Sequence, residues 1–142
     1  MEKLFVEKLS PTAKLPTRAY PNDAGLDFYS DEELILAPGE YGFVKTNIRV
    51  ALPPGYVALF WDKGGLASKH GLHILGGVFD AGYSGDYSVV VINLGPKEYK
   101  IELGQKITQL LIQKVETPEV VETTIDEQTD RGDKRCGSSG LH

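Results

Sequence analysis

At residues 76–86 the chain reads Gly76-Gly77-Val78-Phe79-Asp80-Ala81-Gly82-Tyr83-Ser84-Gly85-Asp86. A carboxylate and an aromatic ring stand three residues apart in this stretch, between four glycines that let the backbone approach a ligand closely. Apolar residues lead in and the strand-like run 87–93 leads out, which predicts a β-hairpin with Asp80 and Tyr83 at its bend. Taken alone, the stretch also fits an ordinary turn, because Gly and Asp dominate turns for conformational reasons.

Outward from this stretch, short runs rich in Val, Ile, Leu, Tyr and Phe recur between Pro, Gly and Asn residues. This pattern predicts an all-β fold, a sandwich or barrel. We expect strands within residues 4–9, 23–30, 34–36, 41–51, 56–61, 87–93, 99–101 and 106–112. One short helix is expected from about Gly65 to His70, with Asp62 at its cap position and its N-terminus open to an anion.

Length and composition limit the function classes. With 142 residues and 41% apolar content, we expect one body domain, residues 1–125, followed by a polar, flexible tail, residues 126–142. A net charge of −5 without a strongly basic face argues against a nucleic-acid partner. The single cysteine, Cys136, excludes an intrachain disulfide framework and a cysteine-rich zinc site. No run approaches membrane-spanning length, so we expect a cytoplasmic, intracellular protein without a membrane partner.

Groups of the kind that hold a triphosphate are spread along the chain. Lys63 stands at the expected helix start, Gln109 lies in a strand among apolar neighbours, and the tail carries a further set: Arg131, Ser138 and Ser139. A water positioned by Asp80 could attack phosphorus, while a divalent ion would offset the phosphate charge. Asp27 alone fits a turn carboxylate that caps nearby amides. Together these residues indicate a nucleotide pyrophosphohydrolase.

Five sequence motifs link the chain to a known family. Through them it resembles the trimeric dUTP pyrophosphatases (dUTPases) over nearly its whole length. The motifs occur in the family's order: Ala24-Gly25-Leu26-Asp27, Lys63-Gly64-Gly65-Leu66-Ala67, Gly77-Val78-Phe79-Asp80-Ala81-Gly82-Tyr83, Gly104-Gln105-Lys106-Ile107-Thr108-Gln109-Leu110, and Arg131-Gly132 through Gly137-Ser138-Ser139-Gly140. The resemblance implies a jelly-roll-like distorted β-barrel with one short helix. It also implies a homotrimer in which active sites lie at subunit interfaces and each C-terminal tail is exchanged to close a neighbour's site.

The function implied by the resemblance is hydrolysis of dUTP to dUMP and pyrophosphate, which limits uracil incorporation into DNA and supplies dUMP for thymidylate synthesis. Asp80 would be catalytic and orient the water that attacks the α-phosphorus, and Tyr83 would lie under the deoxyribose and exclude a 2′-hydroxyl. The backbone from about 72 to 78, including Gly77, would bind uracil, and Asp27 would support the site. Phosphate contacts would come from Lys63, Gly64, Gly65, Gln109, Arg131, Ser138 and Ser139. The Mg²⁺ cofactor would be held by the triphosphate and waters, without direct protein ligands.

The sequence departs from the family pattern at several contact positions. Gly64 stands where the second motif usually has a Ser, and Arg135-Cys136 replaces the usual Gly-Phe whose ring stacks on uracil. Ser84 replaces a common Arg, and Asp86 a common Glu. Losing one donor that acts in the transition state costs roughly 100- to 1000-fold in rate. A catalytically weakened nucleotide-binding or regulatory homologue is therefore an alternative function.

A dCTP deaminase-like enzyme is a second alternative, because that family shares the fold. The catalytic Glu that it would place ten residues after Asp80 is Val90 in this chain.

Overall fold

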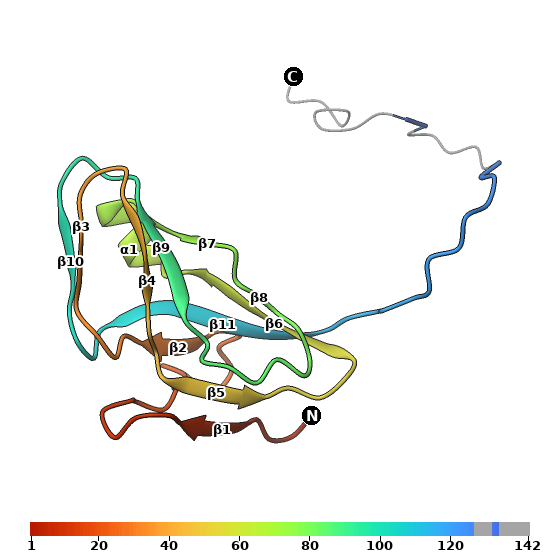
Figure 1. The fold of residues 1–142 in the computed structure, drawn as a ribbon, viewed down its shortest axis with the longest axis horizontal. Helices are drawn as coiled ribbons and strands as arrows, with labels where there is room; N and C mark the ends of the chain where they lie inside the picture. The colour runs from red at the N-terminus through yellow and green to blue at the C-terminus, as the bar shows by residue number, and fades with distance from the viewer. Residues whose placement is uncertain (127–131, 134–142) are drawn as a thin grey trace.

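The computed structural model describes residues 1–126 and 132–133, which form a β-rich body with one short helix (Figure 1). The helix is α1 (Gly64–His70). The strands are β1 (Phe5–Lys8), β2 (Leu26–Tyr29), β3 (Leu34–Leu36), β4 (Tyr41–Val44), β5 (Ile48–Ala51), β6 (Tyr56–Asp62), β7 (Leu72–Leu75), β8 (Val78–Phe79), β9 (Val89–Asn93), β10 (Tyr99–Ile101) and β11 (Lys106–Lys114). Within the described residues, no helix has the length and apolarity needed to cross a membrane.

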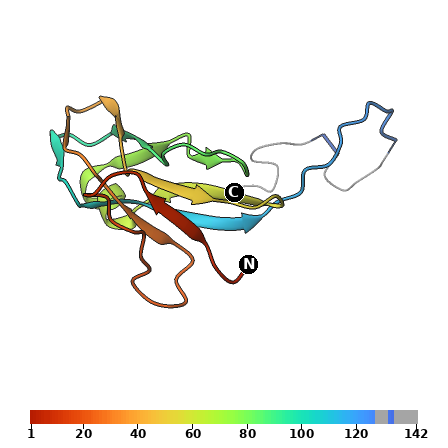
Figure 2. The same ribbon diagram turned by 60° about the horizontal axis from the view of Figure 1, so that its bottom comes forward.

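The strands form two larger sheets and two strand pairs. The larger sheets have the orders β2-β11-β6-β8 and β4-β9-β7, and the pairs are β1-β5 and β10-β3. Figure 2 shows the sheets stacked in layers, with the green strands above the cyan β11. The predicted all-β, jelly-roll-like class with one short helix is confirmed, although hydrogen bonds among the described strands do not close a barrel.

The core lies between the two larger sheets and is rich in aromatic rings. Phe28 of β2 and Phe60 of β6 meet edge to face with their ring centroids 5.1 Å apart. Tyr87, just before β9, is fully buried and stacks on Phe79 of β8 at 4.0 Å. Burial of these rings and of the aliphatic side chains around them supplies the main stabilisation of a body of this size.

The Tyr87 hydroxyl has no hydrogen-bond partner among the described residues. Burial, with a smaller contribution from Tyr83, raises the pKa of Tyr87 to about 12. Because an unpaired buried hydroxyl costs free energy, Tyr87→Phe is expected to leave the free energy of unfolding unchanged or raise it by up to about 1 kcal/mol.

Urea unfolding of a matched pair checks this expectation. Thr108 is equally buried, but its hydroxyl donates to Trp61 O at 2.7 Å. Thr108→Val is therefore expected to lower the free energy of unfolding by about 1 kcal/mol. A Tyr87→Phe variant as unstable as Thr108→Val would show that the Tyr87 hydroxyl does have a partner.

The expected strand 41–51 is two strands, so that prediction was wrong in one respect. It breaks at Lys45–Asn47, and Asn47 has φ 52°, a left-handed conformation that Asn tolerates better than most residues. The break sends β5 to pair with β1 while β4 pairs with β9.

The Asp31 side chain stabilises the break between β4 and β5. Its Oδ2 accepts hydrogen bonds from Ser10 Oγ at 2.6 Å and Asn47 Nδ2 at 2.5 Å. Burial opposes ionisation of Asp31, but the bonds from Ser10, Asn47 and Thr12 outweigh it and hold the pKa of this carboxyl below its ordinary value. The charged carboxylate of Asp31 therefore links the N-terminal segment around Ser10 to the break between β4 and β5.

The predicted hairpin around Asp80 was also wrong in its pairing. β8 pairs with β6, whereas β9 pairs with β7 and β4, so the arms of the stretch belong to different sheets. Gly76 and Gly77, with φ 65° and 93°, turn the chain from β7 into β8. Gly77 O also accepts a hydrogen bond from Phe60 N at 2.9 Å, which fixes the turn against β6. The segment from Asp80 to Ser88 is thus a crossing between two sheets.

Candidate active site

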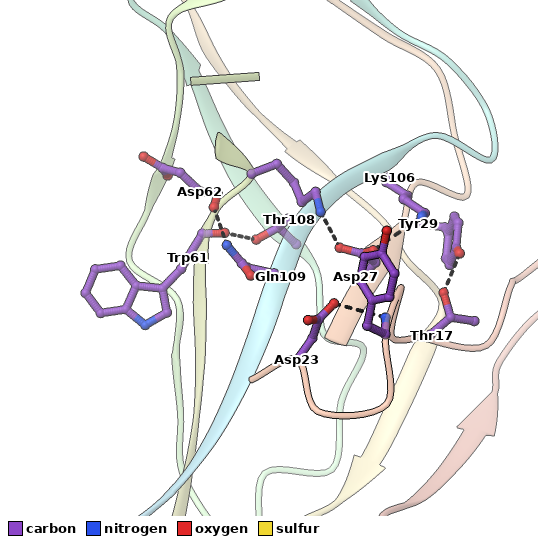
Figure 3. A network of polar contacts seen from close by, with 11 residues as sticks. Thr17, Asp23, Asp27, Tyr29, Trp61, Asp62, Lys106, Thr108 and Gln109 are labelled. Atoms are coloured by element: carbon purple, nitrogen blue, oxygen red, sulfur yellow. Dashed lines mark hydrogen bonds and ion pairs between the residues drawn. The ribbon is translucent and has the colours of Figure 1, made fainter. Parts of the chain in front are cut away.

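The first cluster joins two predicted site residues, Asp27 and Lys63, with Lys106, which was not predicted; Figure 3 shows Lys106 beside Asp27. Asp27 in β2 is buried, and its two oxygens face Lys63 Nζ at 2.5 Å and Lys106 Nζ at 3.3 Å. β2 and β6 both flank β11, which brings these residues together from distant parts of the chain. Two positive charges share one negative charge, so this cluster keeps a net positive charge that suits a phosphate group.

Gln109 lies in the same sheet, directly opposite Asp27 on β2 and Trp61 on β6. Its Nε2 donates to Asp62 O at 2.8 Å, which supplies the partner that a half-buried amide requires (Figure 3). A Cβ at Gly25 would overlap the Gln109 amide oxygen. Gly25 is therefore the position that makes room for the Gln109 side chain.

Asp62 does not cap the helix, so that prediction was wrong. The cap residue of α1 is Lys63, and no side chain caps the helix there. The Asp62 carboxylate instead accepts Ile74 N at 2.7 Å and contacts His73 Nδ1 at 2.8 Å, which ties the end of β6 to β7. The backbone of Asp62 is fixed by these bonds, and its carbonyl in turn orients Gln109.

Gly64 and Gly65 form the exposed first turn of α1 beside this cluster. Apart from the neighbouring residues and the helix backbone, a Cβ at either position would meet no atom of the described residues within 4 Å. Neither residue is among the glycines with positive φ. The turn therefore leaves space for a ligand next to Lys63.

Asp80 and Tyr83 form a second cluster on the crossing that follows β8. Tyr83 N donates to Asp80 O at 3.2 Å, and the exposed Asp80 side chain stands free to meet a ligand. The Tyr83 ring packs 5.7 Å from Phe79 and 6.0 Å from Tyr87, and its hydroxyl donates to Asp86 O at 2.9 Å. The ring is 45% exposed, so one face remains available.

The two clusters lie at opposite ends of β6. Phe79 pairs with Ala58, so Asp80 lies beside the start of β6, while Lys63 directly follows its end. The six residue-to-residue steps from Val57 to Lys63 span on the order of 20 Å of extended chain. A carboxylate that far from the lysines cannot reach a water attacking the phosphate that they hold.

Two hollows lie near these clusters. A cavity of about 220 Å³ between β6 and β7 is lined by Trp61, Asp62 and His73 together with Gly76 and Gly77. A larger apolar groove of about 740 Å³ runs along β1 and β5 and ends at Tyr83. The remaining predicted contacts lie outside the described residues: Arg131, Ser138 and Ser139.

Sequence reasoning missed three residues of the site. Lys106 was placed in a strand and in the fourth motif but given no role at the site, and Asp62 and His73 were not expected to pair. Nothing local in the sequence indicates these contacts, because each depends on which strands become neighbours. His73 is exposed.

Comparisons with known proteins extend over almost the whole chain. A family model described as dUTPase matches residues 11–140. The deoxyuridine 5'-triphosphate nucleotidohydrolase of Mycobacterium marinum is 45% identical, in a match that covers 98% of this chain and 96% of that protein. A mutant of the Staphylococcus bacteriophage 80alpha dUTPase with dUpNHpp has a TM-score of 0.93 at 32% identity, covering 99% of this chain and 100% of that one. A mutant dUTPase from phage phi11 of S. aureus, described with a structural Mg(II) ion, has a TM-score of 0.81 at 31% identity, over 86% of this chain and 97% of that one.

Proposed function

This chain belongs to the dUTPase family, and from that premise we propose that it hydrolyses dUTP to dUMP and pyrophosphate. The observation that carries the proposal is the Lys63–Asp27–Lys106 cluster beside the open turn at Gly64 and Gly65. The cluster offers a net positive charge, and the turn offers exposed backbone amides. Residues of the first, second and fourth motifs come together at this place. This activity removes dUTP before it enters DNA and supplies dUMP, and we place it inside the cell, where DNA precursors are used.

Asp80 is the group proposed to act on the attacking water. Its carboxylate accepts a proton as the water oxygen forms a bond to the α-phosphorus. The bond from that phosphorus to the bridging oxygen breaks, and pyrophosphate leaves with its electron pair. The position of Asp80 just after β8, exposed and without an ion-pair partner among the described residues, supports this role.

The remaining contacts divide between the two clusters. Lys63, Gln109 and the amides of Gly64 and Gly65 would hold phosphate oxygens, with Arg131, Ser138 and Ser139 adding contacts from the tail. Asp27 holds both lysines in place and so supports the site without touching phosphate. Tyr83 would lie under the deoxyribose, and the backbone around Gly77 would bind uracil.

Magnesium fits this site as an ion carried by the substrate. Both Asp27 oxygens face lysines, and within residues 1–126 and 132–133 no three acidic, His or Cys side chains gather to hold a metal. A bound Mg²⁺ would offset the charge that develops on the leaving pyrophosphate. The lysines would complete that neutralisation from the protein side.

Separation of the clusters supports a site built from different copies of the chain, in a homotrimer. Asp80 of one copy would then meet Lys63 of another. Residues 115–126 run away from the body (Figure 1), and Val120 and Ile125 on this segment are 95% and 80% exposed. The apolar groove along β1 and β5 would receive such a segment from a neighbouring copy, which would carry the tail, residues 126–142, to the neighbour's site.

Mixing two inactive variants tests the shared site. Asp80→Asn and Lys63→Ala are each expected to be inactive alone. The two variants would be unfolded and then refolded together in equal amounts. About a quarter of the sites would then take Lys63 from an Asp80→Asn chain and Asp80 from a Lys63→Ala chain, so that both residues are unaltered. Pyrophosphate release from dUTP should recover in that proportion.

Refolding the doubly substituted chain with either single variant is the control, and it should recover nothing. If the mixture of single variants also stays inactive while native mass spectrometry shows mixed trimers, each site draws both clusters from one copy. A monomer mass across micromolar concentrations would contradict the trimer itself.

Gly25→Ala is expected to lower kcat/KM for dUTP by about tenfold while the protein stays folded. The added methyl group would overlap the amide oxygen of Gln109 and turn this side chain away from Asp62 O. Loss of one hydrogen bond to a charged group is worth about 1.5 to 3 kcal/mol. Steady-state kinetics and a melting curve measure the two effects. An unchanged kcat/KM would show that Gln109 does not contact the substrate.

A further inference from the structure

Tyr83 is held by an unusually complete set of contacts for an exposed residue. Its hydroxyl donates to Asp86 O, and its ring packs against Phe79 and Tyr87. A Cβ at Gly85 would overlap the Tyr83 hydroxyl, so only a glycine lets the loop close beneath it. The position of the ring therefore depends on where the Asp86 carbonyl lies.

The Asp86 backbone is in turn fixed by its own side chain. Asp86 Oδ1 accepts Ile48 N at 3.2 Å and Thr46 Oγ1 at 3.1 Å, and the Thr46 hydroxyl shares its proton with Tyr87 O at 2.9 Å. Tyr87 N donates to Ile48 O at 2.8 Å. The carboxylate thus fastens the loop to the break between β4 and β5, which belongs to the rigid body.

We infer that Asp86 is a positioning residue for Tyr83, and that it sets the discrimination between deoxyribonucleotides and ribonucleotides at this site. The inference rests on the proposed function, in which the Tyr83 ring lies under the sugar. A ring held tightly against the 2′ position leaves no room for a hydroxyl. Once the Asp86 carbonyl can move, the ring can withdraw and admit a ribose.

Asp86→Ala is expected to lower the ratio of kcat/KM for dUTP to kcat/KM for UTP by about tenfold, the effect of losing steric contact with one small group. KM for dUTP should rise while kcat stays within about twofold, because Tyr83 contacts the sugar equally before and during reaction. Asp86→Asn should restore the ratio, since its amide oxygen can accept the same two hydrogen bonds. Thr46→Val, which keeps the shape of a buried residue, should give a smaller loss in the same direction.

Asp31→Ala is the matched control. Asp31 also accepts side-chain hydrogen bonds, from Ser10 and from Asn47 at the β4–β5 break, but within the described residues it makes no hydrogen bond to the Tyr83 loop. It should lower the melting temperature without changing the ratio. If Asp86→Ala lowers the melting temperature and leaves the ratio within about twofold of the parent, Asp86 is only structural and the inference is overturned.

The pH dependence of the ratio gives a second readout. Burial raises the pKa of Asp86 above its ordinary value, against the hydrogen bonds from Thr46 and Ile48 and the charge of Lys45. The neighbours of Asp86 are Tyr83, whose hydroxyl donates to Asp86 O, and the buried Tyr87. As pH falls through this raised pKa, the carboxyl gains a proton, and the carbonyl oxygen of a carboxylic acid is a weaker acceptor than either a carboxylate or the amide oxygen of Asn. The ratio should therefore fall in acid for the parent and stay constant for Asp86→Asn, and a parallel fall in both would count against the inference.

A measurement without nucleotide separates this inference from the proposed function. In protein labelled with 3-fluorotyrosine, the Tyr83 fluorine signal is assigned as the one missing from Tyr83→Phe. Asp86→Ala should shift that signal and Asp31→Ala should not. A shifted signal in a protein that does not hydrolyse dUTP would uphold the positioning and reject the proposed function. An unmoved Tyr83 signal in Asp86→Ala would overturn the positioning even in an active enzyme.

Discussion

Asp80→Asn is expected to lower kcat for dUTP by about 1000-fold, within the range attributed to a positioned general base. The amide cannot take the proton of the attacking water, while its size and shape match the carboxylate that it replaces. Because Asp80 is exposed and its side chain makes no hydrogen bond or ion pair within the described residues, the variant should keep the parent's melting temperature. Nucleotide binding should survive as well, since the proposed phosphate contacts lie in the other cluster.

Kinetics at saturating dUTP and calorimetric titration with dUpNHpp measure these two properties. Glu40→Gln is the control: Glu40 is an exposed turn carboxylate that accepts Ala37 N at 3.3 Å, and its substitution should leave kcat unchanged. An Asp80→Asn variant with near-parental turnover would mean that another group orients the water.

Gly64→Ser is expected to raise kcat for dUTP by about tenfold, with a smaller effect on KM. The hydroxyl would add a donor beside the backbone amides at the start of α1, where charge builds on the leaving pyrophosphate. A strained glycine could have forbidden this change. However, Gly64 is not among the positive-φ glycines of the described residues, and its Cβ would meet no atom within 4 Å. The structure therefore accepts a Ser at this position.

Gly64→Ala separates the hydroxyl from the added carbon. Both substitutions should stabilise the helix, because a glycine in a helix costs up to about 1 kcal/mol relative to Ala. Only the Ser variant should raise kcat. Equal kcat values for the Ser and Ala variants, with melting temperatures above the parent's, would mean that the hydroxyl does not reach the phosphate chain.

Local patterns in the sequence predicted most of the elements, and long-range pairing explains the rest. The apolar runs at 56–61 and 106–112 predicted β6 and β11 within one or two residues of their bounds. The prediction of a single strand over 41–51 was wrong because the break in it depends on one Asn in a left-handed conformation. The predicted hairpin at Asp80 was wrong because β8 pairs with β6, and no residue near Asp80 determines that pairing.

Members of the candidate site were predicted more readily than their arrangement. Asp27 and Lys63 stand 36 residues apart, and only the shared neighbour β11 brings them into contact. Asp86 was noted only as a departure from the family, because its partners, Thr46 and Ile48, lie 38 to 40 residues earlier in the chain. Whether the site residues meet as described on a bound nucleotide stays a prediction.

The distance along β6 between Asp80 and Lys63 has a consequence for how activity scales with the amount of protein. If the water-orienting carboxylate and the phosphate-binding lysine act from different copies, a single chain has no turnover at all. Specific activity would then fall on dilution, steeply and reversibly, at concentrations where the assembly comes apart. A cell making few copies would gain almost no activity from each new chain, and beyond a threshold each further chain would contribute in full.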